Sequence, residues 1–246
     1  MESEQQRTAI VTGAGKRVGA ELTRSLLDRG WTVLAHVRDA DAVVPEGAQK
    51  VAANLAEPDC ADIIFAAARD LPPLGLLVNN AARFAHDGFG AFSVDEFDRH
   101  MAINVRAPVL LAEAFAAAHP GPDDALIVNI LDAKLAAPNP DFLSYTLSKQ
   151  ALAGFTELAA RALSARGIRV NAVAPSLMLR SPGQTEANFA AMHHRNPLRR
   201  GTRPQDVVAA IDYLLAVKGV TGEVLVIDGG ERFDPPGRDV QFLESE

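Results

Sequence analysis

The sequence predicts an α/β fold: a doubly wound parallel sheet with helices on both faces. Short apolar segments alternate with helical patterns along the chain, and a glycine-rich turn directly follows the first apolar segment. Strands that alternate with helices form right-handed crossovers in a parallel sheet covered on both faces. The 246 residues, 48% of them hydrophobic, suffice for a sizeable core, and no Gly/Pro/Ser-rich linker divides them. We therefore expect one domain over residues 1–246.

The first half of the chain predicts four strands. Residues 8–12 form the first strand, and the helix that follows places Val18, Leu22 and Leu26 on one face. The further predictions are strands at 32–37, 50–53 and 74–78, with a helix over 59–70.

The second half continues the same alternation. It predicts helices over 93–118, 141–164 and 204–215, and strands at 125–131, 168–173 and 223–227. The long loop over 178–203 is expected to cover the substrate. Residues 231–246 form a polar tail that contact with a partner subunit could order.

Composition and charge exclude several classes of protein. A net charge of −7 without a basic stripe argues against nucleic-acid binding. The single cysteine, Cys60, excludes a disulfide framework and a cysteine-rich zinc site, and His193 and His194 have no ligand-spaced partners, so we expect no metal. The sequence has no apolar run of eighteen residues and no signal-peptide core at its start, which predicts a cytoplasmic protein without a membrane segment.

The glycine-rich turn lies where a dinucleotide fold holds the pyrophosphate. A helix amino terminus offers free N–H groups and partial positive charge, and glycines allow the backbone to approach the phosphates. The expected contacts are Gly13, Lys16, Arg17, Val18 and Gly19. An ordinary glycine turn is the alternative.

The end of the second predicted strand favours NADP(H) over NAD(H). An NAD site places an acid there for the ribose hydroxyls, whereas this chain has Val37 followed by Arg38. Guanidinium groups bind phosphate bidentately, so Arg17, His36 and Arg38 together favour a 2′-phosphate. Alternatively, the arginines are solvated at a surface rim.

Several motifs in order resemble the short-chain dehydrogenase/reductase family. They are T-G-x-x-x-G-x-G (with Arg17 replacing the middle glycine), Asn79-Asn80-Ala81-Ala82, Asn104, Tyr145-x-x-x-Lys149, Pro175-Ser176 and Asp228-Gly229-Gly230. The resemblance covers about residues 7–230 and implies a Rossmann fold. It also implies a homotetramer that pairs through the two long helices, and further cofactor contacts at Asn54, Leu55, Asn80, Ala81, Ala82, Pro175, Ser176 and Leu177.

Tyr145 and Lys149 stand four residues apart and therefore share one helix face. A nearby ammonium favours the phenolate form of a tyrosine, so Lys149 is expected to lower the pKa of Tyr145. The family resemblance implies that Lys149 also holds the nicotinamide ribose and that Asn104 maintains a water-linked proton path. A surface Tyr–Lys pair is the alternative.

Asp132 stands thirteen residues before Tyr145, where the family usually has a serine. A carboxylate repels the charge that develops on a carbonyl oxygen, but it suits a ring nitrogen that receives a proton. With Arg17 in the glycine turn and Phe84 after the Asn-Asn-Ala-Ala motif, the chain resembles the pteridine reductase branch, in which a phenyl ring and nicotinamide sandwich the pterin. Substrate contacts are expected at Arg17, Phe84, Asp132 and Tyr145. Alternatively, Asp132 caps the following loop and Phe84 is a core or lid aromatic.

The sequence thus predicts an NADPH-dependent reductase of dihydropteridines that resemble dihydromonapterin, dihydrobiopterin or dihydrofolate. Asp132, Tyr145, Lys149 and Asn104 would be its catalytic residues. A carbonyl or keto reductase of the same fold is the first alternative. A non-catalytic NADP-binding subunit is the second.

Overall fold

Seven parallel strands form one sheet in the order β3-β2-β1-β4-β5-β6-β7, which confirms the predicted α/β fold. The computed structural model describes residues 6–119, 121, 123–181 and 183–243. The ends of the predicted domain and of the tail, residues 1–5 and 244–246, lie outside them. The strands are β1 (Thr8–Val11), β2 (Thr32–Val37), β3 (Gln49–Ala52), β4 (Leu74–Asn79), β5 (Ala125–Ile130), β6 (Ile168–Pro175) and β7 (Val224–Ile227).

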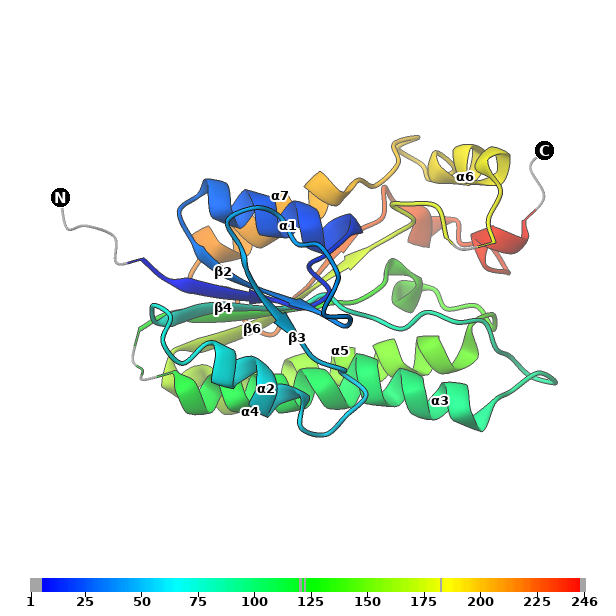
Figure 1. Ribbon diagram of the computed structural model, residues 1–246. Helices are drawn as coiled ribbons and strands as arrows, with labels where there is room; N and C mark the ends of the chain where they lie inside the picture. Colours follow the sequence, from blue (N-terminus) through cyan, green and yellow to red (C-terminus); the bar gives the residue numbers. More distant parts are fainter. Residues whose placement is uncertain (1–5, 120, 122, 182, 244–246) are drawn as a thin grey trace.

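Helices cover both faces of this sheet (Figure 1). Helices α1 (Arg17–Asp28) and α7 (Pro204–Ala216) lie on one face, and α2 (Cys60–Ala67), α4 (Ala107–Ala118) and α5 (Leu143–Leu163) lie on the other. Helix α3 (Val94–Met101) runs on into α4, and α6 (Glu186–His193) lies beyond the sheet near the tail. Short 3-10 turns at Ala133–Ala136, Ser164–Arg166, Glu231–Phe233 and Val240–Phe242 complete the chain.

Two apolar clusters fill the layers on either side of the sheet. One joins β-strand residues to α2, α4 and α5, with Phe115 and Leu111 fully buried, and the other joins the sheet to α1 and α7 through Leu22 and Ile211. Strands β1, β4, β5 and β6 are buried along their whole length because helices cover them from both sides. This explains their near-continuous apolar sequences.

Helix α3, the turn that follows and α4 form one continuous helix over Val94–Ala118. It is 25 residues long and, by length and composition alone, apolar enough to cross a membrane, although we found no sufficiently long apolar run in the sequence. Its inner face packs in the core, where Leu111 and Phe115 are fully buried. It is therefore a core helix of this fold. Its middle, Ala102–Arg106, is a π-helical turn, a feature that often marks functional sites.

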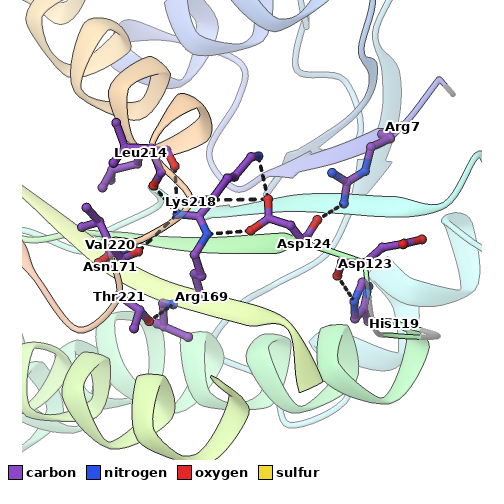
Figure 2. Close-up of polar contacts among 12 residues, drawn as sticks. Arg7, His119, Asp123, Asp124, Arg169, Asn171, Leu214, Lys218, Val220 and Thr221 are labelled. Carbon is purple, nitrogen blue, oxygen red and sulfur yellow. Dashed lines mark hydrogen bonds and ion pairs between the residues drawn. The ribbon is translucent and has the colours of Figure 1, made fainter. Parts of the chain in front are cut away.

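The amino-terminal edge of the sheet is fastened by a polar cluster around Arg169 (Figure 2). Arg169 on β6 donates to the Asp124 carboxylate at 2.6 Å and to the carbonyl oxygen of Leu214 at 2.9 Å. Lys218 donates to the same carboxylate at 2.7 Å, and the Arg7 guanidinium donates to the Asp124 carbonyl oxygen. These contacts join β1, β5, β6 and the α7–β7 connection at the edge opposite the candidate site.

The carboxyl ends of all strands meet at the other edge of the sheet. The chain runs outward from β1 to β3, then returns to β4 on the other side of β1. Such a reversal opens a crevice above the carboxyl ends of β1 and β4, where ligands bind in open α/β sheets. The fold therefore places the glycine turn and the Asp132 to Lys149 region beside one crevice.

Candidate active site

A cavity of about 860 Å³ lies at this carboxyl edge and gathers almost all of the predicted site residues. Every predicted cofactor and substrate residue lines it, and of the predicted catalytic residues only Asn104 does not. The lining residues are Gly13, Lys16, Arg17, Val18, Gly19, His36, Arg38, Asn54, Leu55, Asn80, Ala81, Ala82, Phe84, Asp132, Tyr145, Lys149, Pro175, Ser176 and Leu177.

The glycine turn forms a close-fitting cradle at the start of α1. Gly13 has φ +66°, and a Cβ on Gly19 would lie 2.1 Å from the Gly13 carbonyl oxygen, so larger residues cannot replace Gly19. Helix α1 begins at Arg17, and among the described residues no side chain caps it at Lys16. Its first N–H groups therefore remain available to an anion, and the cradle fits the pyrophosphate of a dinucleotide.

Arg17 adopts the left-handed backbone conformation, φ +53°, at the place where the family motif has glycine. The conformation is thus kept although the residue is not glycine. Its guanidinium donates to the Leu179 carbonyl oxygen at 3.2 Å. Arg17 therefore links the glycine turn to the predicted substrate loop across the cavity.

The predicted 2′-phosphate groups differ in availability. His36 is buried; its Nδ1 accepts from the Gly13 N–H at 3.2 Å and its Nε2 lies 3.0 Å from the Ala53 carbonyl oxygen. Burial lowers the pKa of His36, so its ring is neutral at pH 7 and shapes the cradle without supplying charge. Arg38 is 75% exposed in its side chain and pairs with Asp39 at 3.0 Å. Asp39, which lies two residues after the end of β2, is therefore at the same rim of the cavity as Arg38.

The Asn-Asn-Ala-Ala motif is fixed to the end of β1. The Thr12 hydroxyl accepts from the N–H groups of Asn80 and Ala81 at 2.9 and 3.0 Å, and the Asn80 amide donates to the Thr12 carbonyl oxygen at 2.8 Å. Ser176 bonds to Thr202 at 2.9 Å, which ties the end of β6 to the start of α7. Both sides of the crevice are thereby held rigid.

Tyr145, Lys149 and Asp132 converge at the inner end of the cavity. The Tyr145 hydroxyl donates to Asp132 Oδ2 at 2.8 Å, and Lys149 Nζ donates to the Ile130 carbonyl oxygen at 2.6 Å. Asp132 Oδ1 accepts from the Lys134 N–H at 2.9 Å. Asp132 is therefore both the cap of the following 3-10 turn and the acceptor for the tyrosine.

Burial, together with the charge of Asp132, raises the pKa of the Tyr145 phenol. The net shift of the Tyr145 pKa is opposite to the lowering expected from Lys149, because burial and the carboxylate both favour the neutral phenol. Burial also lowers the pKa of Lys149 to about 8. The site thus holds a protonated tyrosine whose proton points at a carboxylate.

Asn104 lies behind the cavity, in the π-helical turn. Its Oδ1 accepts from the Arg83 N–H at 2.8 Å, and its Nδ2 donates to the Arg83 carbonyl oxygen at 3.0 Å and to the Ser148 hydroxyl at 2.9 Å. Among the described residues, Asn104 makes no direct hydrogen bond to Lys149. It instead fixes the segment before Phe84 and the residue before Lys149.

Phe84 forms an aromatic wall above Tyr145. Its ring is stacked on Phe142 with centroids 4.2 Å apart and meets the Tyr145 ring edge-on at 4.7 Å. Phe84 is 38% exposed and lines the cavity, so part of its ring remains accessible to a flat ligand. The two expectations for Phe84, a packed aromatic and a ligand contact, are compatible.

The tail supplies part of the cavity wall, which sequence reasoning missed. Asp141 accepts from the Arg238 guanidinium at 3.0 Å and from the Asp239 N–H at 2.8 Å, and Asn188 Nδ2 donates to the Leu243 carbonyl oxygen at 2.7 Å. Residues up to 243 are thus ordered by their own chain, where we had considered a partner subunit. The tail residues that line the cavity are Glu231, Arg232, Pro235, Pro236, Asp239, Val240 and Gln241.

Two of these tail residues bring carboxylates toward Asp132. Burial, followed by the charges of Asp132 and Asp228, raises the pKa of Glu231 to about 7. Burial also raises the pKa of Asp239, which lies 3.5 Å from Lys134 Nζ. The substrate end of the cavity therefore has an acidic wall.

Comparison with known proteins fits this geometry. Residues 13–231 match the family described as enoyl-(acyl carrier protein) reductase. The chain belongs to the short-chain dehydrogenase/reductase family. This short-chain reductase is 29% identical over 238 residues to dihydromonapterin reductase from Klebsiella pneumoniae subsp. pneumoniae, with 94% of this chain and 98% of that protein covered.

Two other relatives show the range of chemistry in the family. L-xylulose reductase from Mesocricetus auratus is 32% identical over 242 residues, which cover 91% of this chain and 96% of that protein. The structure of FolM alternative dihydrofolate reductase 1 from Brucella canis, complexed with NADP, superposes with a TM-score of 0.87 at 33% identity, covering 95% and 96% of the two chains. The chain is thus similar both to pterin and folate reductases and to a sugar reductase.

The described residues contain no group of three His, Cys, Asp or Glu side chains that could hold a metal ion. His193 lies at the end of α6, where its Nε2 contacts the Thr202 carbonyl oxygen at 2.9 Å, and stacks on Phe189. The predicted substrate loop, apart from residue 182 outside the described residues, thus contains the helix α6, which the sequence pattern does not predict.

Proposed function

We propose that this short-chain reductase reduces dihydropteridines to their tetrahydro forms with NADPH. The observation that carries the proposal is the 2.8 Å hydrogen bond from the Tyr145 hydroxyl to Asp132 beneath the Phe84 ring. A carboxylate at this place disfavours the negative charge that develops on a carbonyl oxygen, but it favours a ring nitrogen that gains a proton. Phe84 provides the stacking surface that a flat bicyclic ring requires.

The side chains divide the proton transfer between them. Reduction of a C=N bond adds a hydride to carbon and a proton to nitrogen, and NADPH supplies the hydride when bound. Asp132 relays the Tyr145 proton to the ring nitrogen, and the Lys149 ammonium stabilises the phenolate that remains. Its Nζ lies 5.9 Å from the centroid of the Tyr145 ring. Asn104 holds the elements that carry Phe84 and Lys149, and Arg17 closes the substrate loop over the ring.

The residues of the cradle fit NADPH. Gly13, Val18 and Gly19 would hold the pyrophosphate, and Lys16 and Arg38 lie at the rim that the adenosine 2′-phosphate would reach. Arg38 would exchange its exposed partner Asp39 for the phosphate. Lys149 would hold the nicotinamide ribose, and the remaining contacts would come from Asn54, Leu55, Asn80, Ala81, Ala82, Pro175, Ser176 and Leu177.

Reduction of a small carbonyl compound is the second candidate, favoured by the 32% identity to L-xylulose reductase. It would use Tyr145 as the direct proton donor to oxygen and leave Asp132 as a structural cap. The complete set of Asn104, Tyr145 and Lys149 disfavours a non-catalytic NADP-binding subunit.

A substrate panel separates these functions. We expect NADPH oxidation with dihydromonapterin, dihydrobiopterin or dihydrofolate and much slower turnover of small ketones and of NADH. Asp132→Ser, which restores the usual residue of the family, should lose pteridine turnover and retain or gain ketone turnover. Ketone turnover that exceeds pteridine turnover in the unaltered protein would refute the proposal.

The remaining expectations belong to this proposal. Residues 1–246 form one NADP(H)-binding domain in which 178–203 serve as the substrate loop. The protein acts in the cytoplasm on a small molecule, as a homotetramer, without nucleic-acid or membrane partners. Size-exclusion chromatography with light scattering tests the tetramer.

A further inference from the structure

His100 and Ser144 form a buried bridge between the Phe84 segment and α5. Both residues are fully buried, and the Ser144 hydroxyl lies 2.7 Å from His100 Nδ1. The other ring nitrogen, Nε2, accepts from the Ala85 N–H at 3.2 Å. Since Nε2 is the acceptor, the neutral ring carries its proton on Nδ1 and donates it to Ser144.

This bridge repeats, one helical turn earlier, the bridge made by Asn104. Asn104 contacts Arg83 on one side and Ser148 on the other, whereas His100 contacts Ala85 and Ser144. The two bridges therefore hydrogen-bond to the backbone on both sides of Phe84, at Arg83 and at Ala85. On α5 they hold the residues directly before Tyr145 and directly before Lys149.

The arrangement fixes the Phe84 ring relative to the Tyr145 phenol. The two ring centroids lie 4.7 Å apart at an interplanar angle of 88°. The Phe84 side chain is held from the other side by Phe142, and Asp87 Oδ1 accepts from the Ser144 N–H at 2.9 Å, which anchors the start of α5. Through the backbone of residues 83–85, His100 controls where the aromatic wall stands.

We propose that His100 is a positioning residue that sets the width of the slot for the flat substrate ring. His100 does not line the cavity. It acts through Ala85 and Ser144, and its ring meets the Tyr145 ring edge-on with the centroids 6.2 Å apart. This inference rests on the proposed function for the identity of the flat ring. Loss of the bridge leaves the half-buried Ala85 N–H without its acceptor and frees the Phe84 segment at one of its two bridges.

Four variants test the bridge in the full-length protein with NADPH and a dihydropteridine. His100→Phe keeps a ring of similar size without nitrogens, His100→Gln keeps a donor and an acceptor, and Ser144→Ala removes the partner. His119→Phe is the matched control, because His119 is also buried but lies at the far end of α4, with Nε2 2.8 Å from the Asp123 carbonyl oxygen.

We expect His100→Phe to raise the substrate KM about tenfold, with kcat and the KM for NADPH changed less than about threefold. His100→Gln should recover most of this loss, Ser144→Ala should raise the same KM about threefold, and His119→Phe should leave it unchanged. Equal effects of His100→Phe and His119→Phe, or a proportional rise in both KM values, would overturn the inference. If His100→Phe fails to fold, an unchanged KM in Ser144→Ala overturns it.

Failure of the proposed function has a different signature. If the proposed function is wrong, the unaltered protein does not reduce dihydropteridines. If only the bridge is wrong, the unaltered protein does reduce them and the His100 and Ser144 variants keep its substrate KM. A crystal structure of Ser144→Ala or His100→Gln provides a readout that needs no substrate. A shift of the Phe84 ring from Tyr145 in Ser144→Ala, but not in His100→Gln, supports the bridge; an unshifted ring in Ser144→Ala contradicts it.

Discussion

Replacement of Asp132 by Asn tests the proton relay with almost no change in shape. Asp132 Oδ1 accepts from the Lys134 N–H at 2.9 Å and Oδ2 accepts from the Tyr145 hydroxyl at 2.8 Å. The amide of Asn has a single oxygen. This oxygen must face the Lys134 N–H, because the amide NH₂ would otherwise face it and two donors would meet. The amide NH₂ then faces Tyr145, and the phenol loses the acceptor for its proton.

The expected loss follows from this geometry. General acid–base catalysis by one positioned group contributes about 10²- to 10⁴-fold, so kcat for a dihydropteridine should fall about a hundredfold or more in Asp132→Asn. The cap of the 3-10 turn is kept, and the variant should remain folded. The dissociation constant for NADPH should change less than about threefold, because the glycine cradle is untouched.

Steady-state kinetics and NADPH fluorescence titration measure the two quantities. Asp98→Asn is a control, because Asp98 is an exposed carboxylate on α3. A kcat for Asp132→Asn within about threefold of the unaltered protein would show that the carboxylate does not relay the proton. An equal loss of NADPH affinity would show instead that the substitution disturbs the crevice as a whole.

Three further predictions concern charge. Since burial lowers the pKa of Lys149 to about 8, turnover should fall as pH rises through about 8, where the ammonium that stabilises the phenolate is lost; a pH–rate profile flat to pH 9.5 would contradict this role. The unfolded lysine titrates near 10.4 and binds more protons between these pKa values, so the same residue should make the free energy of unfolding rise with pH over that window, measurable by urea titration. Asp124→Asn removes the ion pair to Arg169. The Arg169 side chain is 9% exposed, but the Asp124 side chain is 31% exposed, so solvent weakens the pair. We therefore expect the free energy of unfolding to fall by about 2 kcal/mol and the melting temperature to fall by about 4–8 °C. Calorimetry with Asp98→Asn alongside measures this, and a change below 1 °C would mean that solvent screens the pair.

The sheet and the cavity were predictable because they depend on local patterns. The apolar segments that become β1, β4, β5 and β6 are buried on both faces and so read as strands without ambiguity. The glycine turn and the Tyr145–Lys149 spacing each lie within one short segment. Parallel strands then carry these segments to one edge, which brings Asp132 within hydrogen-bond distance of Tyr145.

The rest depends on contacts between distant residues. Arg238 pairs with Asp141, 97 residues earlier, and nothing in the polar tail sequence marks that partner. The direction of the Tyr145 pKa shift depends on how deeply the phenol is buried, which a four-residue spacing does not reveal. His100 is one histidine in a charged helix until the structure places Ser144 beside it.

The π-helical turn Ala102–Arg106 has a consequence for how this helix tolerates change. It lies between α3, which presents His100 to the Phe84 segment, and α4, which packs on the sheet through Leu111 and Phe115. A π turn contains one residue more than an α turn, so it absorbs an extra residue without rotating the flanking helices by the roughly 100° that one residue contributes to an α-helix. Deleting one residue here would leave α3 and α4 nearly in register but displace Asn104, which lies in the turn itself and holds the Arg83 backbone and Ser148. Insertions and deletions of a single residue at this point would therefore retune the substrate slot without dismantling the fold.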